Sequence, residues 1–177
     1  MRVIAGKYRG RNLKEFNLET TKPTTDRVKE NLFNLIQFQV ADAVVLDLFS
    51  GTGALGIESI SRGAKQVFLI EKNKDAIKII KSNLDGIEGD YILKEMDAFT
   101  FLNETKIKFD IILLDPPYKT DFGVKAIELI LKNDLLNESG VILFETSSEL
   151  NFELNFNGLN VSKKKYGSVT VYKMEKV

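Results

Sequence analysis

The sequence contains no cysteine and no histidine among its 177 residues. Their absence excludes disulfides, cysteine nucleophiles, Ser-His triads and the common zinc sites. An excess of charge is also missing, since 25 basic residues balance 25 acidic ones. No overall field attracts a polyanion, so a nucleic-acid site would need a local cluster of basic residues. We therefore expect chemistry that uses carboxylates, backbone groups and a bound cofactor, with no metal.

Long hydrophobic runs are missing too. No segment approaches the roughly 20 apolar residues of a membrane span, and the N-terminus has no apolar signal-peptide core. A hydrophobic content of 44% is enough to bury one sizeable core at this length. We expect a monomeric, cytoplasmic protein with an N-terminal extension, residues 1–40, and one main domain, residues 41–177.

Apolar runs alternate with amphipathic segments along most of the chain. The predicted strands are 43–49, 66–70, 91–93, 109–114, 140–145, 159–165 and 168–174. The predicted helices are a segment of the extension that spans Val28 to Ile36, a segment that ends near Arg62, and then 75–84, 98–102 and 124–131. The last two strands adjoin Tyr166-Gly167 and predict an antiparallel hairpin. Together they predict a doubly wound α/β fold of Rossmann type, with a mainly parallel seven-stranded sheet.

The strand 109–114 ends at Asp115-Pro116-Pro117-Tyr118, which we call the catalytic turn. Two prolines cannot donate ladder hydrogen bonds and keep the preceding residue extended, so the chain leaves the sheet on a stiff path. A ring with an exocyclic amine fits such a turn, because Tyr118 could stack on the ring while Asp115 and the Pro116 carbonyl accept the amine hydrogens. A surface loop is the simpler alternative. The four residues resemble motif IV of methyltransferases that use S-adenosylmethionine and modify an amino nitrogen, and all four are candidate catalytic residues.

A glycine turn follows the strand 43–49. Gly51, Gly53 and Gly56 have the G-x-G-x-x-G spacing, and Glu71 stands about 20 residues later, where an acid can bind a ribose diol. The spacing also fits a dinucleotide site. However, Asp47 would repel a pyrophosphate, whereas it suits the cationic amino-acid end of S-adenosylmethionine. The run also resembles methyltransferase motif I, so S-adenosylmethionine is the expected cofactor.

Asp97 follows the strand 91–93 and has two compatible interpretations. Its carboxylate could accept the adenine amino group of the cofactor, and it could also cap the helix 98–102. The candidate cofactor-binding residues are Asp47, Phe49, Ser50, Gly51, Gly53, Glu71, Lys72, Asp97, Ala98 and Asp115.

Residues 1–14, which we call the N-terminal arm, contain five basic residues and no acidic one. Such cations, interleaved with an aromatic ring, suit contact with phosphates and an exposed base, although a solvated hairpin is an equal alternative. Arg27 stands in the first turn of a helix, where a cation opposes the helix dipole and mildly suggests a ligand, although a merely solvated side chain is an equal alternative. The candidate RNA-binding residues are Lys7, Tyr8, Arg9, Arg11 and Arg27. A second basic run, residues 163–165, could touch RNA, but protection of a sheet edge against aggregation is the favoured interpretation.

Over nearly its full length the chain resembles the RsmD family of bacterial 16S rRNA guanine-N2 methyltransferases. The resemblance is carried by Arg2–Arg11, Pro23–Glu30, Asp47–Gly56, Leu69–Glu71, Asp115–Tyr118 and Tyr166–Val169. The first two blocks are the specific ones, because many methyltransferases share the others. Tyr118 stands where family members often have Phe, a change that keeps the stacking face. The resemblance implies methyl transfer from S-adenosylmethionine to N2 of one guanine in 16S rRNA, with the small ribosomal subunit as partner.

Other functions stay open from the sequence. A DNA adenine-N6 methyltransferase would use the same turn, but such enzymes usually add a target-recognition domain for which 177 residues leave no room. A nicotinamide oxidoreductase would explain the glycines and leave the catalytic turn unexplained. An RNA-binding module with an inactive methyltransferase fold would keep both motifs and show no turnover.

Overall fold

The computed structural model describes residues 1–16, 26–146 and 156–177. Part of the Pro23–Glu30 block therefore lies outside the described residues. The helices are α1 (Asp26–Asn34), α2 (Ala54–Ser61), α3 (Lys74–Leu84), α4 (Ala98–Glu104) and α5 (Phe122–Lys132). The strands are β1 (Val44–Asp47), β2 (Gln66–Glu71), β3 (Tyr91–Glu95), β4 (Phe109–Leu114), β5 (Leu136–Thr146), β6 (Leu159–Tyr166) and β7 (Val169–Lys176).

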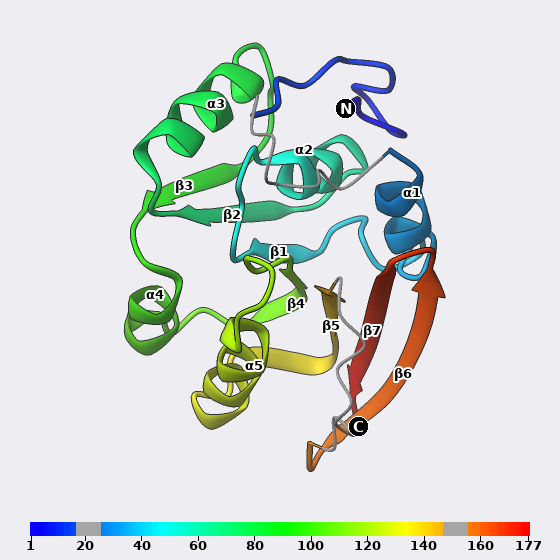
Figure 1. Ribbon diagram of the computed structural model, residues 1–177, viewed down its shortest axis with the longest axis vertical. Helices are drawn as coiled ribbons and strands as arrows, with labels where there is room; N and C mark the ends of the chain where they lie inside the picture. The colour runs from blue at the N-terminus through cyan, green and yellow to red at the C-terminus, as the bar shows by residue number, and fades with distance from the viewer. Residues whose placement is uncertain (17–25, 147–155) are drawn as a thin grey trace.

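The seven strands form one sheet in the order β3-β2-β1-β4-β5-β7-β6 (Figure 1). Strands β1 to β5 run parallel, while β7 is antiparallel to both β5 and β6. The predicted doubly wound sheet with a closing hairpin is confirmed. The strand order reverses between β1 and β4, and ligands of such sheets bind at the carboxyl ends of the strands near this point.

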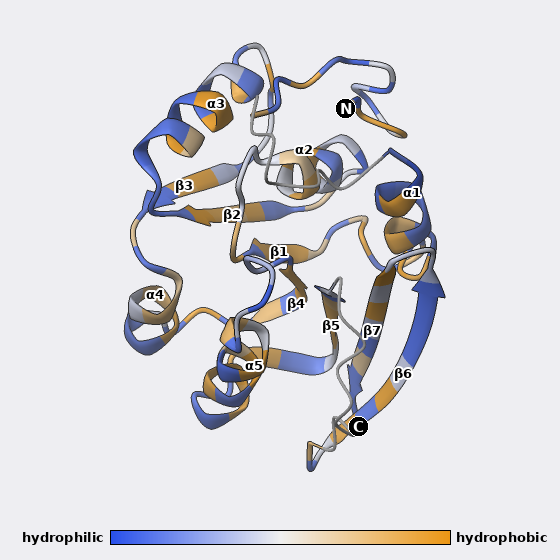
Figure 2. Ribbon diagram, in the orientation of Figure 1, coloured by the Kyte–Doolittle hydropathy of each residue, from blue (hydrophilic) through white to orange (hydrophobic). Residues whose placement is uncertain are grey.

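Helices cover both faces of the sheet, as Figure 1 shows. On one face, α1, α2, α3 and the N-terminal arm contribute to a core cluster that includes Leu13, Phe33, Ile57 and Ile80. On the other face, α4 and α5 pack in a second cluster. The alternation of apolar stripes toward the sheet and polar stripes toward solvent is visible in Figure 2. The central strands are apolar on both faces, as buried parallel strands require.

The N-terminal arm folds back on itself and packs on the end of α2. Val3 donates its N–H to the Arg11 carbonyl at 2.9 Å, and an isolated antiparallel bridge joins Arg2 to Asn12. Gly6 has φ +84°, and a Cβ there would lie 1.8 Å from the Ser61 carbonyl oxygen. Only glycine can make this approach without moving the backbone of α2.

Candidate functional site

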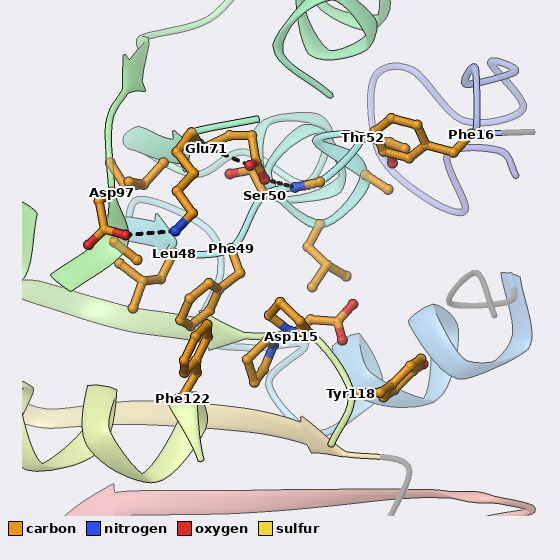
Figure 3. Close-up of a pocket in the computed structure, with 18 of the residues that line it drawn as sticks. Phe16, Leu48, Phe49, Ser50, Thr52, Glu71, Asp97, Asp115, Tyr118 and Phe122 are labelled. Carbon is orange, nitrogen blue, oxygen red and sulfur yellow. Dashed lines mark hydrogen bonds and ion pairs between the residues drawn. The ribbon is translucent and has the colours of Figure 1, made fainter. Parts of the chain in front are cut away.

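A cavity of about 500 Å³ opens at the carboxyl ends of β1, β2 and β4, and we call it the cofactor cavity (Figure 3). Most of the predicted site residues line it, namely Phe49, Ser50, Gly51, Glu71, Lys72, Asp97, Ala98, Asp115, Pro116, Pro117 and Tyr118. Asp47 and Gly53 do not. The motifs found in the sequence therefore converge on one cavity.

Glu71 ends β2 and fixes the glycine turn. Its Oε2 accepts the N–H of Gly51 at 2.9 Å, and its Oε1 accepts the N–H groups of Lys72 and Asn73 at 2.9 and 2.8 Å. The carboxylate is thus held by three backbone donors while it lines the cavity. Such a rigid acceptor suits a pair of ribose hydroxyl groups.

Asp97 begins α4 and also faces Lys72 across the cavity wall. Its Oδ1 accepts the N–H groups of Phe99 and Thr100, so its predicted role as a helix cap is confirmed. Its Oδ2 lies 3.1 Å from the Lys72 ammonium. Burial would raise the Asp97 pKa, but Lys72 and the two helix N–H groups outweigh it and keep the pKa below its usual value. The side chain is therefore an ionised acceptor at neutral pH.

An aromatic wall, which the sequence analysis identified only in part, stands beside Asp97. Phe49 lies 6.2 Å from Phe99 in edge geometry and 6.4 Å from Phe122 in stacked geometry, measured between ring centroids. Phe99 and Phe122 meet edge to face at 5.3 Å. All three rings line the cofactor cavity, which gives it an apolar surface that suits a purine ring.

Asp47 lies behind the glycine turn instead of in the cofactor cavity. It is 1% exposed, and its Oδ2 accepts the Gly56 N–H of α2 at 2.9 Å. Its Oδ1 is buried and has no hydrogen-bond partner. Burial raises the pKa of Asp47 to about 7, and the nearby Asp115 and Glu71 carboxylates add to the rise. Direct contact between Asp47 and the cofactor stays a prediction.

The catalytic turn forms the wall between the cofactor cavity and a second cavity of about 290 Å³. Thr120 donates its hydroxyl to the Pro117 carbonyl at 2.7 Å, which closes the turn before α5. Burial, followed by the Asp115 and Glu145 carboxylates, raises the pKa of Tyr118 to about 12. The phenol therefore stays protonated at neutral pH and offers an aromatic face rather than a base. In Figure 3 its ring stands between the turn and α1.

The candidate RNA-binding residues of the arm are largely engaged within the protein. The Lys7 ammonium pairs with the Glu88 carboxylate at 2.7 Å, and the Tyr8 hydroxyl accepts the Glu88 N–H at 2.7 Å. Arg11 donates to the carbonyls of Asn83 and Asp85. The side chains of Arg9 and Arg27 are exposed.

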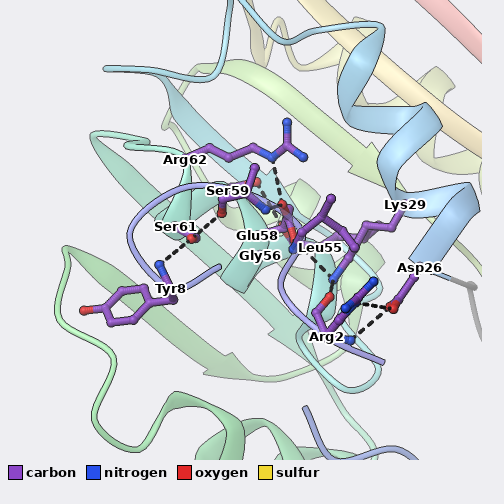
Figure 4. Close-up of polar contacts among 12 residues, drawn as sticks. Arg2, Tyr8, Asp26, Lys29, Leu55, Gly56, Glu58, Ser59, Ser61 and Arg62 are labelled. Carbon is purple, nitrogen blue, oxygen red and sulfur yellow. Dashed lines mark hydrogen bonds and ion pairs between the residues drawn. The ribbon is translucent and has the colours of Figure 1, made fainter. Parts of the chain in front are cut away.

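A buried ionic network that the sequence analysis missed attaches the arm to α2 (Figure 4). The Glu58 carboxylate accepts the N–H groups of Ile4 and Ala5 at 2.9 and 3.1 Å, and it pairs with Lys29 at 3.2 Å and Arg62 at 2.8 Å. Lys29 and Glu58 are both 0% exposed. Burial lowers the pKa of Lys29, while Glu58 opposes that change. One signal existed, since Lys29 shares the helical spacing of the apolar residues of α1.

The edges of the site include residues without a motif. Met1, Glu15 and Phe16 of the N-terminal segment line the cofactor cavity, and Figure 3 shows Phe16 above Thr52.

Among the described residues, no group of acidic side chains is placed to hold a metal ion. No helix in the same part of the chain is long and apolar enough to cross a membrane.

Known proteins resemble the chain over most of its length. A family model described as Conserved hypothetical protein 95 matches residues 1–175. The chain is 36% identical over 154 residues to ribosomal RNA small subunit methyltransferase D of Haemophilus influenzae, which covers 84% of this chain and 80% of that protein. The Escherichia coli protein of the same name is 34% identical over 150 residues, 84% of this chain and 76% of that protein.

A solved structure has the same fold as this chain. An Escherichia coli protein described as a methyltransferase superposes with a TM-score of 0.89 and 30% identity, covering 99% of this chain and 97% of that one. The family match, the two relatives and the shared fold agree with the motifs that meet at the cavity. The chain belongs to the RsmD family, the family of ribosomal RNA small subunit methyltransferase D.

Proposed function

We propose that this protein transfers a methyl group from S-adenosylmethionine to the exocyclic N2 of a guanine in 16S rRNA of the small ribosomal subunit. One observation carries the proposal: the catalytic turn borders the same cavity as Glu71, Asp97 and the aromatic wall. An amine held at the turn thus lies next to a nucleoside-sized site. Membership of a family whose matched relatives are named for rRNA methylation supports the class of substrate.

The cofactor cavity fits S-adenosylmethionine on chemical grounds. The rings of Phe49, Phe99 and Phe122 offer an apolar surface for adenine. The ionised Asp97 is an acceptor for the adenine amine, and Glu71 is an acceptor for the ribose. When bound, this cofactor supplies a methyl group attached to a sulfonium. The sulfur leaves as a neutral thioether, which needs no general acid or metal.

The catalytic turn prepares the guanine amine. The N2 lone pair is delocalised into the ring, so the amine is a poor nucleophile until acceptors hold its hydrogens and the nitrogen becomes more tetrahedral. Asp115 and the Pro116 carbonyl are such acceptors, and their contacts count most in the transition state. Removing a base from its stack costs a few kcal/mol, and stacking on Tyr118, at about 1–3 kcal/mol, offsets much of it.

The test offers three substrates to the protein with labelled S-adenosylmethionine. Small subunits and naked rRNA from cells that lack the enzyme are compared with unmethylated duplex DNA, and each product is digested to nucleosides. We expect label in N2-methylguanosine from the subunits and almost none from DNA. Label in N6-methyladenine would move the function to DNA methylation. Binding of the cofactor without label in any substrate would favour a binding module.

A further inference from the structure

Glu145 lies beside the catalytic turn, although no motif includes it. Strand β5 pairs in parallel with β4, with Leu113 opposite Leu143. The pairing continues to Leu114 and Phe144, so Asp115 and Glu145 are the next residues along two adjacent chain segments that lie about 4.8 Å apart where they pair. Leu113 and Leu143 belong to the same core cluster, and side chains two residues apart share a face of the sheet. Asp115 and Glu145 therefore emerge on the same face.

The second cavity connects this residue to the turn. It is lined by Pro116, Pro117 and Tyr118 of the turn, and by Phe144, Glu145 and Thr146 at the end of β5. The three residues of the turn also line the cofactor cavity. If the amine of a base lies at the turn, the second cavity lies beside that base, and Glu145 lines this cavity.

Glu145 is placed where a carboxylate is costly for the folded protein. It is 1% exposed, and the neighbouring strand β4 is followed directly by a second acid, Asp115. Both carboxylates act on Tyr118, whose pKa they raise in addition to the effect of burial. Like charges close together in a buried site destabilise each other. A ligand that brings N–H donors to both carboxylates would relieve this repulsion.

Guanine carries such donors, whereas adenine does not. The Watson–Crick edge of guanine presents N1–H next to its N2 amine, so it offers two adjacent donor groups. Adenine presents an amine next to an N1 lone pair. A second carboxylate at that position accepts the N1–H of guanine and repels the N1 of adenine. A site that hydrogen-bonds one group and leaves the competitor unpaired discriminates strongly.

We propose that Glu145 is the residue that selects guanine. Its carboxylate accepts N1–H of the unstacked base in the second cavity, while Asp115 and the Pro116 carbonyl hold the N2 amine. The inference rests on the proposed function, because it assumes that the turn receives a base amine. It adds a specificity residue and a place for the ring, neither of which follows from the catalytic turn alone.

The test changes the Watson–Crick edge of the substrate base and one group of the protein. After the methylated nucleotide has been mapped, small subunits are assembled from 16S rRNA that carries either guanine or 2,6-diaminopurine at that position. Diaminopurine keeps the 2-amine but has a lone pair at N1 and an amine in place of O6. Single-turnover rates are measured for the wild-type protein, for Glu145→Gln and for Glu138→Gln. Glu138 is the matched control, an 84% exposed side chain on the same strand that pairs with Lys176.

We expect the wild-type protein and Glu138→Gln to prefer guanine by on the order of 100-fold. Glu145→Gln should lower this ratio at least tenfold, because its amide can donate to the N1 lone pair of diaminopurine. Unfolding temperature and cofactor affinity serve as checks that Glu145→Gln is folded. An unchanged ratio in the folded variant overturns the inference. So do equal wild-type rates on the two RNAs, a result that needs no variant. Absence of methylation on guanine would instead refute the proposed function.

Discussion

The cofactor side of the site and the predicted RNA side, which comprises the N-terminal arm and α1, are held together by different kinds of contact. On the cofactor side, residues of one βαβ unit meet, as when Glu71 accepts the Gly51 N–H. On the RNA side, distant segments meet, since Glu58 accepts N–H groups from Ile4 and Ala5, 54 and 53 residues away. The cofactor side therefore depends on local motifs. The RNA side depends on the packing of the arm and α1 against α2, and a fault in that packing should affect it first.

The largest expected effect comes from Glu58→Gln, which tests that dependence. The change leaves the buried Lys29 ammonium without its carboxylate, and breaking a buried pair in this way costs about 3–5 kcal/mol of unfolding free energy. Urea denaturation would measure the loss. Glu88→Gln is the control, because it removes only the exposed pair with Lys7 and should leave the unfolding midpoint almost unchanged. Equal stability of the two variants would show that the network does not hold the arm.

Asp115→Ala tests whether methyl transfer can be separated from cofactor binding. The rate of methyl transfer should fall about 100- to 1,000-fold, as when one preorganised polar contact is removed from a transition state. Cofactor affinity should fall only modestly, because Asp115 is assigned mainly to the target amine. Calorimetry and single-turnover kinetics would separate the two quantities. Asp75→Ala, on the exposed face of α3, should change neither. Normal turnover in Asp115→Ala would remove this residue from catalysis.

The pH dependence of stability tests the environment of Asp47, which is buried behind the glycine turn. Its pKa is raised from 3.8 to about 7 in the folded protein, so between these values the folded state holds a proton that the unfolded state has lost. Stability should therefore fall as pH rises from about 4 to about 7, by up to about 1.4 kcal/mol per pH unit. Asp47→Asn cannot ionise and should show a flatter profile in urea unfolding. Identical profiles would mean that Asp47 is ionised throughout this range.

Glu71→Ala should have an effect opposite to that of Asp115→Ala. Loss of a charged hydrogen-bond partner should weaken cofactor binding by about 1–3 kcal/mol, while turnover at saturating cofactor stays closer to normal. Calorimetric titration with S-adenosylhomocysteine gives the affinity. Glu95→Ala is a close control, since Glu95 lies opposite Glu71 on β3 but does not line the cavity. Unchanged affinity in Glu71→Ala would exclude Glu71 from the cofactor site.

Sequence patterns predicted local elements better than contacts between distant segments, for a physical reason. Strand β4 has its predicted bounds, and the turn after it lies where expected, because apolar periodicity and prolines act locally. Strand β5 begins at Leu136, earlier than the predicted residue 140, because a polar stretch interrupts the apolar pattern while Leu136 pairs with Phe109 across a register shift. The place of Phe122 in the aromatic wall depends on the packing of α5 beside α4, which local sequence patterns do not predict.

Tertiary contacts also change which of the two cationic segments, the N-terminal arm or residues 163–165, is the better candidate for contact with RNA. The sequence analysis assigned RNA binding to the arm, yet its tip lies at Ser61, the last residue of α2. At 1.5 Å per residue, eight residues of helix separate it from the glycine turn by about 12 Å. The run 163–165 ends opposite Thr170, which pairs with Thr146 at the carboxyl end of β5. That lysine run therefore lies at the same edge of the sheet as the catalytic turn.

The smallest expected effect distinguishes these segments by the salt dependence of RNA binding. Arg9→Gln should lower the log–log slope by about one unit, the value for one phosphate contact, and neutralising Lys7 and Arg11 should lower it less because both are engaged within the protein. Changing residues 163–165 to Gln should flatten the slope more than Arg9→Gln does, because three exposed cations lie on the strand that ends at this edge of the sheet. Lys65→Gln, an exposed lysine at the opposite end of β2, is the control. If the triple change promotes aggregation and leaves the slope unaltered, the run only protects the edge strand, and the arm remains the RNA contact.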